Sequence, residues 1–382
     1  MGSFKRVWVG LFFFLWAGSS GAGEGGPLLF KDDLDRDSLE RAIHRSLEFL
    51  QRLPADRVVG EWPRKFTSGE VRESLLSFLE LKGLWKSPES LARAIHSRFD
   101  LFPSDGNDGR NVLFTGYYQP LIAGSLTESS EYRFPLYRKP ADMIEAEQVT
   151  LGSQPSVEKI VGRLEEDRFV PYYSRHEIDG LGLLKGKGYE VAWVKDPVEL
   201  FFLHIQGSGI LQLEDGRRLN INYAASNGRP YRSIGKVLLE RGKISEAELS
   251  MARLRRYLRE SPEERDPLFA ANETYIFFRF VKEGPLGSLE VPLTPGRSIA
   301  TDSRLFPKGA LAFVASRRPL SDNAGNAVGW QLFSRFVVNQ DTGSAIRGSK
   351  RVDLYFGSGE RAGIDAGHMK SAGQLYFLIK KK

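Results

Sequence analysis

The hydrophobic pattern of the chain changes near residue 108, and this change limits the available folds more than any other feature. Before it, apolar residues recur at the spacing of amphipathic helices in three stretches, 35–53, 68–81 and 88–99. Asp35 or Asp37 is placed to cap the first stretch, and a proline opens the third. We therefore expect three packed helices at the N-terminal end of the fold.

After residue 111 the chain consists mostly of short strand-like segments separated by turns. The clearest turn is Asp215-Gly216, which joins two alternating segments and predicts a β-hairpin. Residues 200–213 are expected to form a strand-like segment that runs through Gly207-Ser208-Gly209. A helical stretch covers 233–260, and strand-like segments then return up to the C-terminus. The predicted fold class is mainly β with N-terminal helices.

The two β-rich parts are separated by a helical stretch, but no linker rich in proline or serine lies between them. The 382 residues allow two or three domains at roughly 150 residues each. Because no linker marks a boundary, we expect one domain to be inserted into the other.

The first residues have the layout of a secretory signal. Lys5 and Arg6 precede an apolar run, Val7–Ala17, and small residues then lead to a plausible cleavage site after Ala22. The alternative is an uncleaved membrane anchor, although eleven apolar residues are too few to span about 30 Å of hydrocarbon. We expect residues 1–22 to be a signal peptide and the remainder to be exported.

Composition excludes several classes of chemistry. The chain contains no cysteine, so it has no disulfide, thiolate nucleophile, zinc finger or cysteine-linked lipid. The five histidines are scattered and show no metal-binding spacing, and no phosphate-binding loop is present. We therefore expect no metal and no cofactor. The net charge of +6 suits an anionic polymer but is too small to indicate nucleic acid.

The remaining candidates for chemistry are aspartates. Asp341 ends an apolar segment, Asp353 lies in a second segment twelve residues later, and Asp302 precedes another. The turn-rich, basic stretch between the first two predicts that their strands bring both carboxylates to one rim. Two alternatives stay open. Each aspartate is a turn or capping residue, or Asp-Thr-Gly at 341–343 belongs to an aspartic protease, which requires a second such loop or a homodimer of a small domain.

Two stretches combine aromatic side chains with amides, hydroxyls and glycines. They are 114–120 (FTGYYQP) and 202–209 (FLHIQGSG). Aromatic faces stack on sugar rings while amides and hydroxyls bond to sugar hydroxyls, so these stretches indicate a sugar-binding surface. The alternative is that the aromatic side chains belong to the core.

Taken in order, five segments resemble the membrane-bound lytic murein transglycosylase A family. They are 114–120 (FTGYYQP), 201–216 (FFLHIQGSGILQLEDG), 222–235 (NYAASNGRPYRSIG), 300–311 (ATDSRLFPKGAL) and 340–378, whose aspartates resemble the three-aspartate (3D) domain. The resemblance implies a split double-psi β-barrel formed by residues 28–119 and 244–382. An inserted β domain, residues 120–243, and a deep groove between the two domains are implied as well.

The resemblance also implies a reaction, the cleavage of the β-1,4 bond between N-acetylmuramic acid and N-acetylglucosamine with a 1,6-anhydromuramyl product. Such an enzyme is a carbon–oxygen lyase acting on polysaccharides. When the muramyl C6 hydroxyl attacks its own C1, the nucleophile is already in place, and one carboxyl can act as acid and then as base. By position that residue is Asp353. The implied supporting residues are Asp341 and Asp302, and the implied groove residues are Thr115, Tyr117, Gln206 and Ser208.

The chain departs from the family pattern at two points. Ser344 stands where the family often has a glycine, and there is no cysteine to carry a lipid anchor. The implied partners are peptidoglycan glycan strands and proteins of cell-wall synthesis or division, with no nucleic acid. The implied location is the periplasm, in association with the outer membrane. A glycan-binding barrel without catalysis remains a second interpretation.

Overall fold

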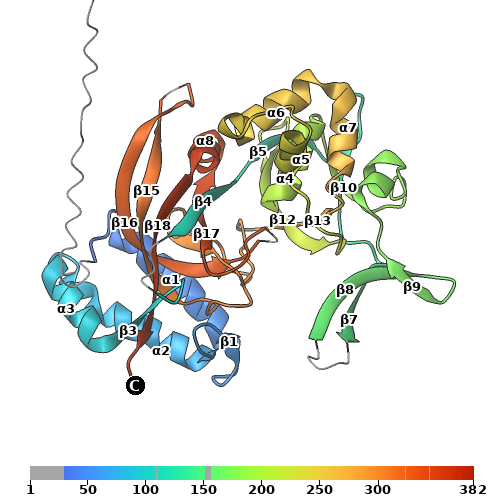
Figure 1. Ribbon diagram of the computed structural model, residues 1–382. Helices are drawn as coiled ribbons and strands as arrows, with labels where there is room; N and C mark the ends of the chain where they lie inside the picture. The colour runs from blue at the N-terminus through green and yellow to red at the C-terminus, as the bar shows by residue number, and fades with distance from the viewer. Residues whose placement is uncertain (1–29, 108–110, 151–155, 323, 344) are drawn as a thin grey trace, which may run out of the picture.

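A computed structural model describes residues 30–107, 111–150, 156–322, 324–343 and 345–382 (Figure 1). The expected signal peptide at 1–22 and the serine at position 344 lie outside the described residues. Within the described part of the chain, no helix has both the length and the apolar character needed to cross a bilayer.

The larger sheet closes into a barrel of six strands. In spatial order they are β15 (Leu311–Ser321), β16 (Ala327–Asp341), β14 (Ser298–Ala300), β17 (Arg351–Ser358), β4 (Val112–Gln119) and β18 (Lys370–Lys380). Strand β18 pairs back with β15 and closes the barrel, while β3 (Phe99–Pro103) pairs with the outer part of β18. Pairing is parallel between β14 and β16 and between β17 and β4. The predicted mainly β fold class with N-terminal helices is confirmed.

The N-terminal helices pack against one end of the barrel, where Figure 1 shows them in blue and cyan. They are α1 (Arg36–Gln51), α2 (Ser68–Leu79) and α3 (Pro88–Arg98), as the apolar spacing predicts. The Asp35 side chain caps α1, and Thr67 with Glu70 forms a capping box on α2. The apolar faces of these helices share one core with the barrel strands.

A buried ion pair fixes α1 to the barrel. Arg297 is fully buried, and its Nη1 lies 2.6 Å from the Asp32 carboxylate and 2.7 Å from the Phe336 carbonyl oxygen that accepts its hydrogen bond. Its Nε donates to the Ser38 hydroxyl at 3.0 Å. Because a buried charge without partners is strongly unfavourable, this network ties the start of α1 to β14 and β16.

The second sheet has six strands and its own core. In order they are β13 (Ile276–Val281), β12 (Arg218–Ser226), β11 (Ser208–Gln212), β5 (Leu121–Ser125), β10 (Glu190–Val194) and β6 (Phe134–Tyr137). The predicted hairpin at Asp215-Gly216 joins β11 to β12, and Gly216 takes a φ of +86° that favours glycine. Because β13 pairs with β12, this sheet continues past the expected domain limit at residue 243.

Smaller elements surround the second sheet and the barrel. Helices α5 (Ile234–Glu240), α6 (Met251–Glu260) and α7 (Pro262–Ala270) share a core with α4 (Pro197–Gln206) beside the second sheet. Strands β7 (Ile144–Thr150), β8 (Ser156–Glu165) and β9 (Arg168–Pro171) form a separate sheet that projects from the molecule (Figure 1). The other elements are β1 (Val58–Gly60), β2 (Phe66–Thr67), η1 (Glu80–Leu84), η2 (His176–Gly180), η3 (Glu246–Glu248) and α8 (Glu360–His368).

One expected strand is wrong. Residues Pro197–Gln206 form the helix α4, although their aromatic and branched side chains suggest a strand. The Asp196 side chain caps the helix, Pro197 opens it, and Gly207 ends it at a φ of +75°. The helix is buried on most sides, so it lacks the amphipathic pattern by which surface helices are predicted.

Candidate active site

Three of the predicted site residues lie in one row across the barrel wall. Ala300 on β14 is the register partner of both Asp341 on β16 and Asp353 on β17. Asp353 is in turn the register partner of Thr115 on β4. Neighbouring strands lie about 4.8 Å apart, so the backbones of the two aspartates are roughly 10 Å apart. The pairing therefore brings both aspartates to one row of the barrel wall, with β14 between their strands.

Asp353 is a nearly enclosed carboxyl with few partners. The exposed fraction of its side chain is 14%. The Thr115 hydroxyl donates a hydrogen bond to its Oδ1, and Arg351 Nε lies at 3.4 Å from the same oxygen. Burial raises the pKa of Asp353, and the Arg351 charge and the Thr115 hydrogen bond oppose this only in part. The carboxyl therefore keeps its proton to a higher pH than an exposed aspartate.

Asp341 is held by backbone donors from two loops. Its Oδ1 accepts hydrogen bonds from the Ser288 amide at 2.9 Å and from its neighbour Thr342 at 2.8 Å. Burial, with a smaller contribution from the nearby Asp353 charge, raises the pKa of Asp341 to about 6 against the opposing effect of these donors. Asp341 therefore changes its protonation state close to neutral pH.

Tyr117 lies beside the aspartate row on β4. Its ring centroid is 5.3 Å from that of Tyr355 on β17, and its hydroxyl is buried without a hydrogen bond of ordinary geometry in the described structure. Burial, and then the charges of Asp341 and Asp353, raise the pKa of Tyr117 well above its usual range. The phenol stays protonated, so it can donate a hydrogen bond within the site.

Asp302 has a different environment. Its carboxylate pairs with Arg304 through contacts of 3.0 and 2.7 Å and accepts a hydrogen bond from the Gly348 amide at 2.9 Å. The Arg304 hydrogen bonds hold the pKa of Asp302 well below its usual range. Within the described residues no hydrogen bond or ion pair joins it to Asp341 or Asp353. Asp302 therefore fixes the turn before β17 and does not reach the row.

The other two predicted residues lie where the second sheet meets the barrel. Gln206 ends α4, and its Oε1 accepts a hydrogen bond from the Tyr118 amide at 3.2 Å. Ser208 begins β11 two residues later. Gln206 thus contacts β4 at Tyr118, next to Tyr117 in the chain, and Ser208 begins the strand that follows α4.

Some residues that connect the two sheets or hold the aspartate row have almost no signal in the sequence. Gln119 is buried at the end of β4, where its Nε2 donates to the Gly209 carbonyl oxygen at 3.2 Å and its Oε1 accepts from the Ser358 hydroxyl at 2.7 Å. In the sequence, the only sign that Gln119 bridges the two sheets is its position as a polar residue between a strand-like segment and Pro120. Ser288, which holds Asp341 from 53 positions away, gave none.

No three His, Asp or Glu side chains of the described chain are grouped so that they could hold a metal ion. The chemistry available to the described row comes from two carboxyls with raised pKa values, one phenol and one hydroxyl. Such a row can donate and accept protons in an enclosed setting, as general acid–base catalysis requires.

Comparison with known proteins defines the class of this fold and site. Residues 297–379, which contain the three aspartates, match the 3D domain. Residues 113–279 match the MltA specific insert domain. The chain therefore combines a 3D barrel with an MltA-type second domain.

The particular family follows from relatives of similar length. The membrane-bound lytic murein transglycosylase A of Escherichia coli K12 is 32% identical over 283 residues, which cover 73% of this chain and 69% of the relative. The chain belongs to this family. A crystal structure of a membrane-bound lytic murein transglycosylase from Agrobacterium tumefaciens has a TM-score of 0.74 at 30% identity and covers 91% of this chain and 93% of its own. E. coli MltA with bound chitohexaose has a TM-score of 0.67 at 25% identity, with coverage of 93% and 96%.

Proposed function

We propose that this protein is a peptidoglycan lytic transglycosylase that cleaves the β-1,4 bond between N-acetylmuramic acid and N-acetylglucosamine and forms a 1,6-anhydromuramyl end. The observation that supports the proposal is the environment of the Asp353 carboxyl. This carboxyl is enclosed and accepts a hydrogen bond from the Thr115 hydroxyl, and burial raises its pKa. Membership of the family supports the substrate class, and a relative that binds chitohexaose supports a glycan ligand.

In the proposed mechanism Asp353 acts twice. Protonated Asp353 first donates its proton to the glycosidic oxygen, so the leaving sugar departs as an alcohol. The muramyl C6 hydroxyl then bonds to C1, and the Asp353 carboxylate accepts the hydroxyl proton. The enzyme regains its starting protonation state without a second catalytic carboxylate, because the nucleophile belongs to the substrate.

Asp341 and Tyr117 are proposed as positioning residues for this step. The amides of Ser288 and Thr342, which both donate to Asp341, tie the loop at Ser288 to the end of β16 beside the row. The Tyr117 phenol keeps its proton and supplies a donor whose partner is the Asp341 carboxyl or a substrate oxygen. Asp302 is proposed to support the same region from outside the row by holding the turn at Gly348.

The proposed glycan groove follows β4 and the start of β11. In the described hydrogen-bond network the side-chain oxygen of Gln206 accepts a hydrogen bond from the backbone amide of Tyr118. The side-chain nitrogen of Gln206 and the hydroxyl of Ser208 have no protein partner in this network. Both groups are therefore available to sugar hydroxyls beside the Thr115 and Tyr117 face. We further propose that the chain is exported to the periplasm and works at the outer membrane.

Two other functions fit the observations less well. An aspartic protease needs two aspartates that share a proton, but the strands of Asp341 and Asp353 are separated by β14, and no hydrogen bond joins these carboxyls in the described structure. A glycan-binding barrel without catalysis has no use for an enclosed carboxyl of raised pKa, since its burial costs stability.

The test is the mass of the products released from purified peptidoglycan. A lytic transglycosylase yields muropeptides one water lighter than those of a hydrolase. We expect the lighter, anhydro products. Products of hydrolase mass would contradict the mechanism, and binding to peptidoglycan without release of products by folded protein would favour the glycan-binding alternative.

A further inference from the structure

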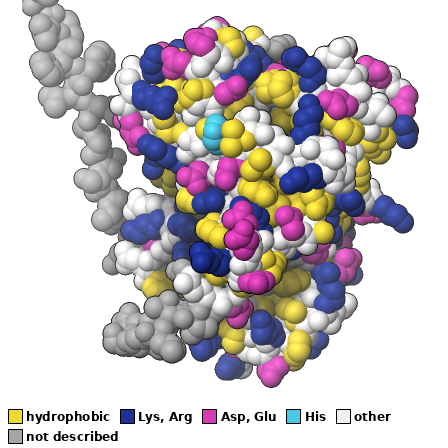
Figure 2. Space-filling model, turned by 90° about the vertical axis from the view of Figure 1, so that its right-hand side faces the viewer, with side chains coloured by type: hydrophobic (Ala, Val, Ile, Leu, Met, Phe, Trp, Pro, Cys, Tyr) yellow, Lys and Arg dark blue, Asp and Glu magenta, His cyan; other side chains and the backbone are white. Residues whose placement is uncertain are grey.

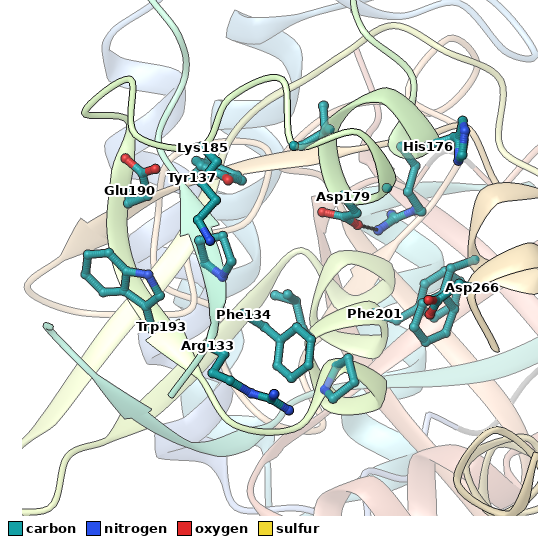
Figure 3. Close-up of a pocket in the computed structure, with 18 of the residues that line it drawn as sticks. Arg133, Phe134, Tyr137, His176, Asp179, Lys185, Glu190, Trp193, Phe201 and Asp266 are labelled. Atoms are coloured by element: carbon teal, nitrogen blue, oxygen red, sulfur yellow. Dashed lines mark hydrogen bonds and ion pairs between the residues drawn. The ribbon is translucent and has the colours of Figure 1, made fainter. Parts of the chain in front are cut away.

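The second domain contains a pocket that the proposed function does not use. Its volume is about 910 Å³, and it lies among β6, β10, η2, α4 and α7 (Figure 3). None of the residues proposed for the glycan site lines it. A pocket of this size accommodates a small-molecule ligand or a short peptide.

The charges that line this pocket are balanced. Four acidic and four basic side chains contribute to its wall. Figure 2, which views the side of the molecule that carries α7 and the β7–β9 sheet, shows acidic and basic side chains interleaved with apolar ones. Since neither sign dominates, the lining suits a ligand with both charges better than a polyanion.

One end of the pocket offers a carboxylate that is only weakly paired. Arg175 is 2% exposed and donates to the carbonyl oxygens of Asn272 and Thr274 at 3.1 and 2.6 Å. Its contact with the Asp179 carboxylate is longer, 3.4 Å (Figure 3). Enclosure in the pocket raises the pKa of Asp179, and the charge of Arg175 opposes part of this increase. The exposed fraction of the Asp179 side chain is 38%, so the carboxylate can be reached from the pocket. A ligand ammonium would give this carboxylate a closer charged partner than Arg175.

Another part of the wall offers two cations that are weakly paired or have no carboxylate partner among the described residues. The Arg133 guanidinium lies over the Phe134 ring at 5.5 Å from its centroid and has no carboxylate partner among the described residues. Lys185 has only a distant contact, 3.8 Å, with Glu128. Arg133 can therefore bind a ligand carboxylate through two parallel hydrogen bonds.

Aromatic side chains line the space between the charged groups. Phe134 and Trp193 face the pocket beside Arg133 and Lys185 (Figure 3). On the Asp179 side, Phe201 lines the wall and stacks on Phe269 at a centroid distance of 4.4 Å. These rigid apolar surfaces suit the aliphatic part of a ligand whose two ends are charged.

We propose that this pocket binds a zwitterionic peptide, with its ammonium at Asp179 and a carboxylate at Arg133. The inference rests on the proposed function for the source of the ligand, since peptidoglycan carries short peptides beside its glycan strands. Helix α4 connects the two sites: Phe201 lines the pocket, and Gln206 at the helix end lies at the proposed glycan groove. At 1.5 Å per residue, the ten-residue helix spans about 15 Å. The enzyme would hold its polymer by sugar and by peptide at once.

The test is a titration of the whole protein with a soluble cell-wall tripeptide that has free ammonium and carboxylate groups, followed by calorimetry and tryptophan fluorescence. Arg133→Ala and Asp179→Asn should each weaken binding by about tenfold, as the loss of one charged hydrogen bond predicts. Acetylation of a side-chain ammonium of the peptide, or amidation of its carboxylate, should weaken binding similarly. Arg41→Ala and Asp100→Asn, exposed changes outside the pocket, are the matched controls.

Several results would overturn the inference: no saturable binding, equal affinity for the blocked peptides, or equal effects of pocket and control variants. Arg133 is exposed, so its variant keeps the test valid even where Asp179→Asn fails to fold in thermal unfolding. Asp353→Asn should bind the peptide as the wild type does. Anhydro products without peptide binding would contradict only this inference, and peptide binding without glycan cleavage would contradict only the proposed function.

Discussion

Asp302 and Asp353 have the same type of side chain in opposite electrostatic settings. Asp302 lies at the turn before β17, and Asp353 lies in the row across the barrel wall. The Asp302 side chain is fully buried but has two contacts with Arg304 and one backbone donor, which hold its pKa low. Asp353 is also enclosed, but it has one hydroxyl donor and one long contact with Arg351, and its pKa is raised. Burial alone therefore does not decide what an aspartate does, because the partners decide whether it holds structure or carries a proton.

The largest expected effect is that of Asp353→Asn. The amide keeps the shape of the side chain and can still accept the Thr115 hydrogen bond, but it cannot donate and regain a proton. We expect the rate of anhydromuropeptide release to fall by about a thousandfold or more, as the loss of a general acid predicts. Product release measured by mass spectrometry, with thermal unfolding as a check of the fold, tests this.

Asp302→Asn is the matched control within the same domain. Its activity per folded molecule should stay within a few-fold of that of the wild type. If the two asparagine variants lost activity equally, the contrast between a structural and a catalytic aspartate would be wrong.

Asp341→Asn should change how stability depends on pH. The folded-state pKa is about 6 and the ordinary value is 3.8, so the native state binds more protons than the unfolded state between these values. The free energy of unfolding therefore falls as pH rises from about 4 to about 6, by roughly 2–3 kcal/mol. The variant lacks this loss, and its Oδ1 can still accept both amide hydrogen bonds.

Urea unfolding at pH 4.5 and at pH 7.5 measures the effect of Asp341→Asn. The stability of the variant relative to the wild type should rise between the two pH values, whereas Asp100→Asn, at an exposed site, should show no such change. A relative stability that is the same at both pH values would show that Asp341 is not enclosed in the way described.

Asp302→Ala should destabilise the protein by about 2 kcal/mol at neutral pH, because it leaves the Gly348 amide without its acceptor. The Arg304 side chain is 67% exposed, so its ion pair adds little in water. Since the folded pKa is lowered, the stabilisation is present above pH 4 and is lost as pH falls further. The difference from the wild type in urea should therefore shrink in acid, and a constant difference would contradict the assignment.

Local patterns in the sequence were sufficient for elements whose signals are also local. Helix α1 has its Asp35 cap and apolar spacing, and the β11–β12 hairpin has its Asp-Gly turn. Helix α4 escaped prediction because it is buried on most sides, so its periodicity is weak and its composition resembles that of a strand. There tertiary packing overrides local propensity.

The same distinction applies to the site. Asp341 and Asp353 could be found because both lie at strands in one short segment. The placement of β14 between them depends on a strand some 40 residues before Asp341, and no local pattern predicts that pairing. The Ser288 amide and the Gln119 bridge are also long-range contacts made by residues that look unremarkable in the sequence.

The smallest expected effect, and the finest test of the contrast between Asp302 and Asp353, concerns Thr115. Its hydroxyl favours the ionised form of Asp353, so Thr115→Val should raise the pKa of that carboxyl further and move the corresponding limb of the pH–rate profile to higher pH. The loss of about 1 kcal/mol of hydrogen bonding should lower kcat a few-fold, with little change in KM. Valine fits a strand as well as threonine does, so β4 should keep its pairing with β17. Thr115→Ser retains the hydroxyl and should show the wild-type pH–rate profile. If Thr115→Val did not shift the profile, the Thr115 contact would not control the proton on Asp353.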